Sequence, residues 1–149
     1  MLARTFHDFY RDLCRANGWA IRYDMDYEQL PATIQAEYVA AAERMPRVLK
    51  AANLMLVPKD HPDALDVEKT RELVQQKMEI LSEAEHKGWM EHRKAQDWHL
   101  GAMRDDEKKI SPWLIPYSEL PELEKEKDRS NVRHYPDIAD MTGMAIAKD

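Results

Sequence analysis

The sequence predicts a mainly helical domain with a few short strands, an α+β fold in which two similar halves pack as one compact domain. Its 149 residues suit one domain of ordinary size. Hydrophobic residues make up 44% and charged residues 34%, with only 4 glycines, which is typical of a globular, helix-rich chain. Apolar residues also recur at helical spacing, and one stretch of the chain resembles another.

Charge and composition argue against several functional classes. The net charge of -6 disfavours a nucleic-acid binder that relies on phosphate contacts. No apolar run approaches the ~18 residues of a membrane-spanning helix, and residues 1–8 lack the apolar core of a signal peptide. The single cysteine, Cys14, cannot form an internal disulfide and fits a reducing compartment. We therefore expect a cytoplasmic protein that binds neither nucleic acid nor membranes.

Apolar spacing predicts the first elements. Residues 2–17 place apolar side chains on one face of a helix, and we expect Gly18 to end it. Residues 19–23 are expected to form a short strand. A second amphipathic helix is predicted after Pro31.

Pro46 falls inside this second helical pattern. Because proline costs roughly 3 kcal/mol in a helix interior, we expect a break at Met45 and a new short helix that starts at Pro46. Asn53 tolerates the left-handed conformation that closes such a helix. Residues 54–57 are then predicted to form a strand.

A linker and two further helices follow. Residues 58–62 are predicted to be a linker, and residues 67–80 have a helical composition. Ser82 and Glu85 have the spacing of a capping box, which predicts that another helix starts there and runs to about Gln96.

Two stretches of the chain align with two later stretches, which predicts an internal duplication. Residues 7–19 align with residues 86–98, and residues 27–57 align with residues 117–147. The paired residues share histidine, aromatic or helix-ending character: His7 with His86, Tyr10 with Trp89, Trp19 with Trp98, Tyr27 with Tyr117, Pro46 with Pro136, and Asn53 with Gly143. The alternative is that helical segments share apolar spacing by chance.

The duplication sets the predicted domain organisation. Residues 1–57 form a degenerate first copy, residues 58–81 a linker and helix, and residues 82–149 the second copy. Both copies are expected to break their second helix at a proline and to close it with Asn53 or Gly143.

The second copy carries the more specific sequence. Its motifs combine tryptophans with a loop of acidic and basic residues: AEHKGW at 84–89, DWHLG at 97–101, RDDEKK at 104–109, PWLIPY at 112–117 and KDR at 127–129. These motifs resemble the ryanodine-receptor repeat, a small domain that occurs as tandem pairs in the cytoplasmic part of those calcium-release channels. It also occurs in small stand-alone proteins of bacteria and their viruses. The resemblance is strong over residues 84–129 and weak but in register over residues 7–57.

Three positions depart from the family pattern. Asp97 stands where the family usually has a glycine before the second tryptophan. Ala102 and Ser111 stand where it usually has a proline and a histidine. The first copy also lacks the loop of acidic and basic residues, so the resemblance bears on the fold more directly than on a ligand.

Trp19 and Trp98 are the leading candidates for a binding site. A duplicated domain tends to pack about a pseudo-twofold axis, so equivalent positions meet at one cleft, where two indoles can hold a flat ring between them. Stacking of a base on an aromatic side chain is worth ~1–3 kcal/mol. The resemblance implies that the cleft between the repeats accepts an adenine nucleotide, with these tryptophans against the base. The alternative is that both indoles anchor the core.

Cationic side chains near Trp98 are candidates for phosphate binding. Arg104 is the first of these, in a loop that also contains Lys108 and Lys109, because arginine can bind a phosphate through two hydrogen bonds. Arg129 could reach a phosphate from the following helix. The alternative is that these residues belong to a solvated loop and a solvated helix surface.

The remaining candidates would complete a nucleotide site. Asp128 could accept a hydrogen bond from an exocyclic amine or a ribose hydroxyl. Arg22 and Tyr23 follow Trp19 and are the nearest candidates for the same roles in the first copy, and Tyr117 completes the predicted set.

These residues predict a non-enzymatic module that binds a small, nucleotide-like ligand in order to sense or sequester a nucleotide signal. No cofactor or metal is expected, because His86, His92 and His99 lack the spacing of a closed ligand set and there is no second cysteine. A hydrolase ranks third, since the sequence offers no evident nucleophile and base. The alternative is a protein–protein interaction module without a small ligand. Assembly with further copies of the chain is left open.

Overall fold

The computed structural model describes residues 2–149, and most of them are helical. The elements follow one another as α1 (Leu2–Asn17), the 3-10 turn η1 (Tyr27–Gln29), α2 (Ala32–Ala51), β1 (Leu54–Pro58), α3 (Val67–Gln76), α4 (Met78–Ala95), β2 (His99–Leu100), β3 (Ile110–Ser111), η2 (Tyr117–Glu119), α5 (Glu122–Arg133), α6 (Tyr135–Met141) and β4 (Met144–Lys148). None of these helices is long and apolar enough to cross a membrane.

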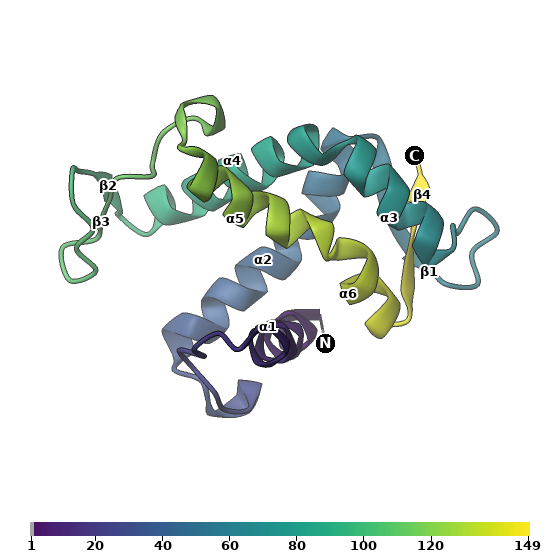
Figure 1. The fold of residues 1–149 in the computed structure, drawn as a ribbon, viewed down its shortest axis with the longest axis horizontal. Coiled ribbons are helices and arrows are strands. Elements are labelled where there is room, and N and C mark those ends of the chain that lie inside the picture. Colours follow the sequence, from purple (N-terminus) through teal and green to yellow (C-terminus); the bar gives the residue numbers. More distant parts are fainter. Residues whose placement is uncertain (1) are drawn as a thin grey trace.

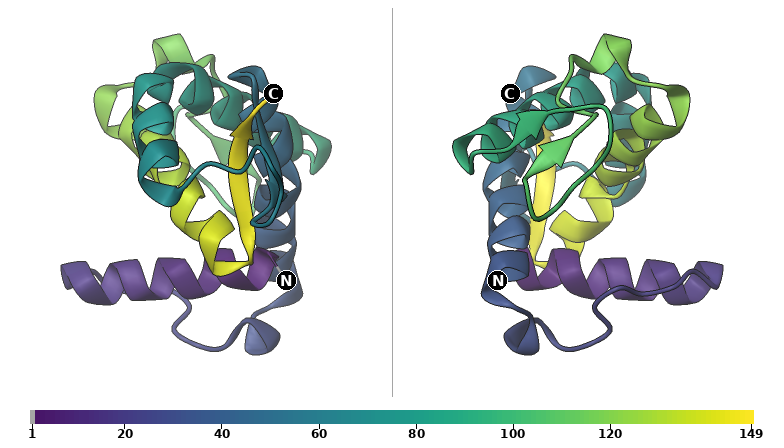
Figure 2. Two further views of the ribbon diagram at one scale, coloured as in Figure 1. Left: turned by 90° about the vertical axis from the view of Figure 1, so that its right-hand side faces the viewer. Right: turned by 90° about the vertical axis from the view of Figure 1, so that its left-hand side faces the viewer.

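Two small sheets lie at opposite ends of the molecule, with helices between them (Figure 1). Helices α4 and α5 pack along each other, and α2 packs against α4. Helix α1 lies across one end of α2, as Figure 2 shows from two sides. Strands β2 and β3 form a short parallel pair at the end where α4 finishes.

The second sheet joins the two halves of the chain, because β1 pairs with β4 in antiparallel orientation. Leu56 faces Ile146 at the centre of this ladder, Leu54 faces Lys148 at one end, and Pro58 faces Met144 at the other. The register is symmetric about the central pair. Strands from both halves therefore contribute equally to one sheet.

The main core also combines both halves. Buried apolar side chains from α2, β1, α3, α4, α6 and β4 form one cluster, which includes Met45, Leu54, Val74, Leu81, Ala139 and Ile146. A smaller cluster around Tyr27 and Leu30 packs under α1. The predicted fold is thus confirmed in its main features: a mainly helical, compact domain with short strands.

A buried ion pair lies beside this core. The guanidinium of Arg44 on α2 donates to Glu85 on α4, with Nη2 3.0 Å from Oε1 and Nε 3.4 Å from Oε2. The hydroxyl of Tyr135 on α6 donates to the same carboxylate at 2.9 Å. All three side chains are buried. A buried carboxylate needs such partners, since desolvation of an ion costs several kcal/mol. This cluster fixes α2, α4 and α6 relative to one another.

Glycine at position 88 leaves room for the side chain of Arg44 to reach Glu85. A Cβ atom at position 88 would lie 2.6 Å from Cδ of Arg44 and 3.3 Å from its Cγ. Gly88 lies in the interior of α4, where glycine normally costs roughly 1 kcal/mol relative to alanine. Close passage of the Arg44 side chain accounts for glycine at this position.

Several predicted elements are confirmed. Helix α1 matches residues 2–17 and ends at Gly18, whose φ of +68° is left-handed. Strand β1 begins at Leu54, as predicted. Asn53 and Gly143 both adopt positive φ, 57° and 77°, immediately before the strands of the second sheet.

The predicted break at Met45 is wrong, because α2 runs through Pro46 without interruption. Pro46 is exposed, while Met45, Val48 and Leu49 are buried on the inner face of the helix. Burial of a large apolar side chain contributes about 1.5–3 kcal/mol, so three of them outweigh the cost of one proline. In the second half the break does occur, since α5 ends before Pro136 and α6 begins beside it.

Two further local predictions are wrong. Residues 19–23 form turns and irregular backbone, because no described segment lies beside them as a partner strand. The helix expected to start at Ser82 starts at Met78 instead, and Ser82 and Glu85 are buried inside it. Their spacing places both side chains on the inner face of α4, and it does not mark an N-terminal helix cap.

The close approach of Gly88 and Arg44 predicts an unusual substitution effect. Gly88→Ala should lower the free energy of unfolding, although alanine is the better helix former by about 1 kcal/mol. Urea denaturation of both proteins measures this difference. In an R44A/E85Q background, which removes the buried pair as a unit, the same substitution should stabilise the protein. Stabilisation by Gly88→Ala in the wild-type background would contradict the packing described.

Candidate functional site

A cleft lies between the first half of the chain and the loop that follows α4. It has a volume of about 590 Å³. Arg22, Tyr23 and the first turns of α2 line one side, and Trp98, Arg104 and Lys109 line the other. We call it the interhalf cleft. It brings together four of the eight predicted site residues, two from each half.

Cationic side chains outnumber carboxylates in the interhalf cleft. Arg22, Arg93, Arg104 and Lys109 line it together with Glu37 and Asp106. Since the arginines and the lysine are permanently charged at neutral pH, the cleft favours an anionic ligand.

The carboxylate of Asp106 already contacts cationic side chains of this cleft. Its Oδ1 atom accepts from Nε of Arg104 at 2.7 Å, and its Oδ2 atom lies 3.9 Å from Nη2 of Arg22. The hydrogen bond from Arg104 lowers the pKa of Asp106, so the carboxylate is ionised at neutral pH. Asp106 therefore links the two halves across the cleft.

Trp98 is covered on one side. The guanidinium of Arg93 lies 4.7 Å from the centre of the Trp98 ring and 5.5 Å from that of Trp89, within cation–π range of both. Burial lowers the pKa of Arg93, opposed by the charge of Glu37. Only the other face of the Trp98 indole is left for a flat ligand.

A second cavity adjoins the interhalf cleft and shares Arg93, Trp98 and Arg104 with it. We call it the α4–α5 cavity, and its volume is about 260 Å³. Its other lining residues include Trp89, Trp113, Ser111, Asn131 and Asp128. Asp128 is the one predicted site residue that belongs to this cavity alone.

Sequence reasoning missed Trp113 and Arg44 as cavity residues. Trp113 lies in the PWLIPY motif at 112–117, and its aromatic side chain could have identified it as a cavity residue. Arg44 had none, because its role depends on Glu85, which is far away in sequence.

His86 forms the inner wall of the α4–α5 cavity. Its Nε2 atom lies 2.7 Å from the carbonyl oxygen of Ile115, and its Nδ1 atom lies 3.3 Å from Oδ2 of Asp128. Both neighbours accept hydrogen bonds, so the arrangement suits an imidazolium that donates from both nitrogens. Burial lowers the pKa of His86, but Asp128, the Ile115 carbonyl and Glu85 outweigh it and raise the pKa above 6.5.

Trp19 does not join Trp98 in the lining of either space. Its side chain is 57% exposed, and it is not among the described residues that line the interhalf cleft or the α4–α5 cavity. Neither space therefore contains the expected pair of stacked tryptophans. The irregular backbone of residues 19–23 accounts for this, since no strand fixes the indole toward the second half.

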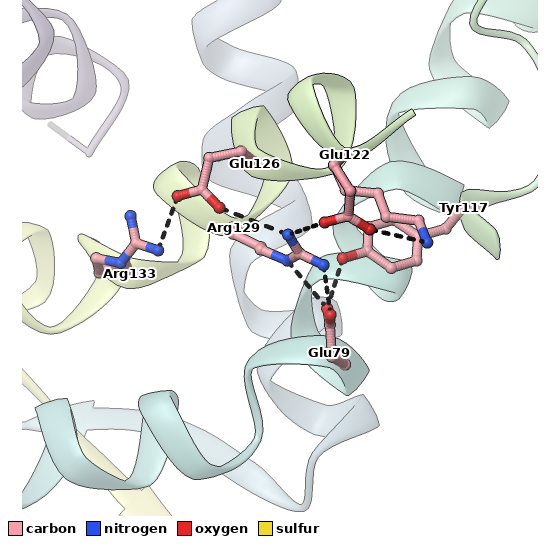
Figure 3. A network of polar contacts seen from close by, with 7 residues as sticks. Glu79, Tyr117, Glu122, Glu126, Arg129 and Arg133 are labelled. Atoms are coloured by element: carbon pink, nitrogen blue, oxygen red, sulfur yellow. Dashed lines mark hydrogen bonds and ion pairs between the residues drawn. The ribbon is translucent and has the colours of Figure 1, made fainter. Parts of the chain in front are cut away.

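Arg129 and Tyr117 form a separate polar network (Figure 3). Arg129 donates to Glu79 at 2.6 Å and to Glu122 at 2.9 Å, and it lies 3.6 Å from Glu126. The hydroxyl of Tyr117 donates to Glu79 at 2.5 Å, and burial and this bond raise the pKa of Tyr117 to about 12. With three carboxylates around it, Arg129 is already neutralised, and its arrangement supports a role in joining α4 to α5.

No group of three or more His, Cys, Asp or Glu side chains within residues 2–149 is placed to hold a metal ion. The three histidines considered from the sequence are dispersed. His86 is buried against Asp128, His92 faces Glu37, and His99 lies in exposed β2.

The His86 geometry predicts how its pKa responds to substitution. Asp128→Asn should lower the pKa of His86, because the amide keeps the shape of the side chain but not its charge. Proton NMR titration of the imidazole measures this, with His7 as an internal control. Where Asp128 is ionised, the stabilisation by the pair is complete below the ordinary pKa of 6.5 and is lost as the pH rises through the raised pKa. An unchanged pKa would show that the two side chains do not interact.

The network around Glu79 predicts a pH-dependent loss of stability. The hydrogen bonds from Arg129 and Tyr117 lower the pKa of Glu79 below 4.5. Its stabilising effect is therefore present above pH 4.5 and is lost as the pH falls through the lowered pKa. Glu79→Gln should destabilise the protein at pH 7 and have little effect near pH 3, as measured by thermal melting. Glu83→Gln, at an exposed position of the same helix, serves as the control.

One family model matches the chain over residues 61–148, and its description is RyR domain. The matched region runs from the segment before α3 to the end of β4 and contains His86, Trp98 and Asp128. Residues 2–60, with α1, α2 and β1, lie outside the match. The match covers more than half of the chain, and the protein belongs to the RyR domain family, with one RyR domain over residues 61–148.

Proposed function

We propose that this protein is a non-enzymatic module that binds a nucleotide-like, adenine-containing molecule in the interhalf cleft and so senses or sequesters a nucleotide signal. One observation carries the proposal. Arg22 and Tyr23 from the first half and Trp98 and Arg104 from the second half line a single cleft. The resemblance to ryanodine-receptor repeats implies an adenine nucleotide in the equivalent place.

The side chains of the cleft suit the two parts of such a ligand. Arg22, Arg104 and Lys109 supply charge for phosphates, and the arginines can bind two oxygens at once. The free face of Trp98 offers a surface for the base, with stacking worth ~1–3 kcal/mol. The base therefore stacks on one indole here, and Trp19 plays no part in binding.

We further propose that residues 1–57 and 82–149 are tandem repeats, joined by the linker and helix of residues 58–81. Both halves run helix, 3-10 turn, helix and strand, with β2 and β3 inserted in the second half and its second helix divided into α5 and α6. The β1–β4 register is unchanged when the halves are exchanged. His7 and His86 also occupy equivalent settings. Nε2 of His7 lies 2.6 Å from the carbonyl oxygen of Met25, as Nε2 of His86 does from Ile115 at 2.7 Å.

Thermal melting with ATP, ADP, AMP and cyclic adenine nucleotides tests the ligand proposal. A ligand at 100 times its Kd adds about 2.7 kcal/mol of stability, so the melting temperature should rise by several degrees. Arg104→Ala and Trp98→Ala should abolish the rise while the proteins stay folded. Arg133→Ala and Trp19→Ala, both outside the cleft, should retain it.

The other outcomes have distinct meanings. The absence of a shift with every nucleotide would contradict the proposal and favour a protein interaction module. Conversion of a nucleotide to product in the same samples would contradict the non-enzymatic assignment.

A further inference from the structure

A third cavity, of about 240 Å³, lies where α1 meets α2, α5 and α6. We call it the α1 cavity. Phe6, Phe9 and Leu13 of α1 line it, together with Tyr38 and Ala41 of α2. Arg44 and Glu85 line it as well, and the same two residues line the α4–α5 cavity. The two cavities therefore adjoin each other at the buried ion pair.

The α1 cavity occupies the position in the first half that the α4–α5 cavity occupies in the second. In the alignment of residues 27–57 with residues 117–147, lining residues of one correspond to lining residues of the other: Tyr38 to Asp128, Ala41 to Asn131, and His134 to Arg44. This correspondence rests on the proposed duplication but not on the proposed nucleotide. It indicates that the α1 cavity is the counterpart of the α4–α5 cavity and not an accidental packing gap.

The two cavities differ in chemistry. Where the α4–α5 cavity has the carboxylate of Asp128, the α1 cavity has the ring of Tyr38, while the amide of Asn131 lines both cavities. Phe9 adds a further ring, whose centre lies 4.8 Å from that of His134. An aromatic lining of this kind favours a flat, apolar ligand.

Arg44 is the buried arginine in the lining of the α1 cavity. Its side chain is more than nine-tenths buried. Nε and Nη2 donate to Glu85, while Nη1 is buried without a hydrogen-bond partner among the described residues. A buried donor without a partner is costly, and an acceptor on a ligand would relieve this cost. Glu37 and Glu85 line the same cavity, so a neutral acceptor is favoured over an anion.

We infer that the α1 cavity binds a small, neutral aromatic molecule that carries an oxygen acceptor, such as an aryl amide or a phenol. The ring lies among Phe6, Phe9 and Tyr38, and the oxygen accepts from Nη1 of Arg44. The site is distinct from the interhalf cleft, and its ligand class follows from the lining alone.

Benzamide is a suitable probe, because it combines a flat ring with a neutral carbonyl. In a titration of the full-length 15N-labelled protein followed by NMR, saturable shifts are expected at residues 6–13 of α1 and 38–41 of α2. Benzoate and cyclohexanecarboxamide, which lack the neutral acceptor or the flat ring, should bind more weakly. Nuclear Overhauser contacts from the benzamide ring to Phe6, Phe9 and Tyr38 would place it directly in the wild-type protein.

Two variants at adjacent positions provide the control. Ala41→Phe fills the α1 cavity and should weaken benzamide binding by about tenfold or more. Ala40→Phe adds the same ring next to it on α2, at a residue that does not line the cavity, and should leave the affinity within about twofold. Absence of saturable shifts in the wild-type protein, or shifts confined to residues 98–109, would overturn the inference. Arg104→Ala, which removes nucleotide binding under the proposal above, should leave benzamide binding unchanged.

Discussion

The buried contact of Arg44 with Glu85 and Tyr135 determines how the helices of this protein fit together. A charge pair in a core is unfavourable unless nearly every polar atom has a partner, and here one carboxylate accepts hydrogen bonds from two helices. The contact requires glycine at position 88 and brings α2 of the first half into the RyR domain of the second. Arg44 and Glu85 also line two cavities, so the charges that hold the helices together are part of the lining of both.

His7 and His86 share one contact and differ in another. His7 and His86 both point a ring nitrogen at a loop carbonyl. On the other side of the ring, His86 has the carboxylate of Asp128, whereas His7 has Tyr38, with ring centres 5.1 Å apart. The contact with a loop carbonyl is therefore common to both histidines, whereas the second neighbour is a carboxylate for His86 and an aromatic ring for His7.

Local sequence pattern was sufficient to predict α1, much of α2, the strand after Asn53 and the helix-closing role of Asn53 and Gly143, because those features depend on local periodicity and on φ preferences. It failed at Pro46 and at residues 19–23, where the outcome depends on distant packing. For the candidate site, residue type and motif were sufficient to single out Arg22, Tyr23, Trp98 and Arg104, which line one cleft. Trp19 and Arg129 were chosen on the same grounds, yet the one is exposed and the other is neutralised by carboxylates that no local pattern reveals.

The carboxylate of Asp106 would compete with an anionic ligand for the cationic side chains of the interhalf cleft. It holds Arg104 by a short hydrogen bond and lies near Arg22, so an incoming anion exchanges places with a carboxylate that is already there. Such an exchange yields little for a ligand with a single negative charge, because one ion pair replaces another. A ligand with several charges can neutralise Arg22 and Lys109 as well, and its advantage over a monoanion grows accordingly. Under the proposed function, the cleft would therefore favour a ligand with several negative charges over a monoanion of the same shape.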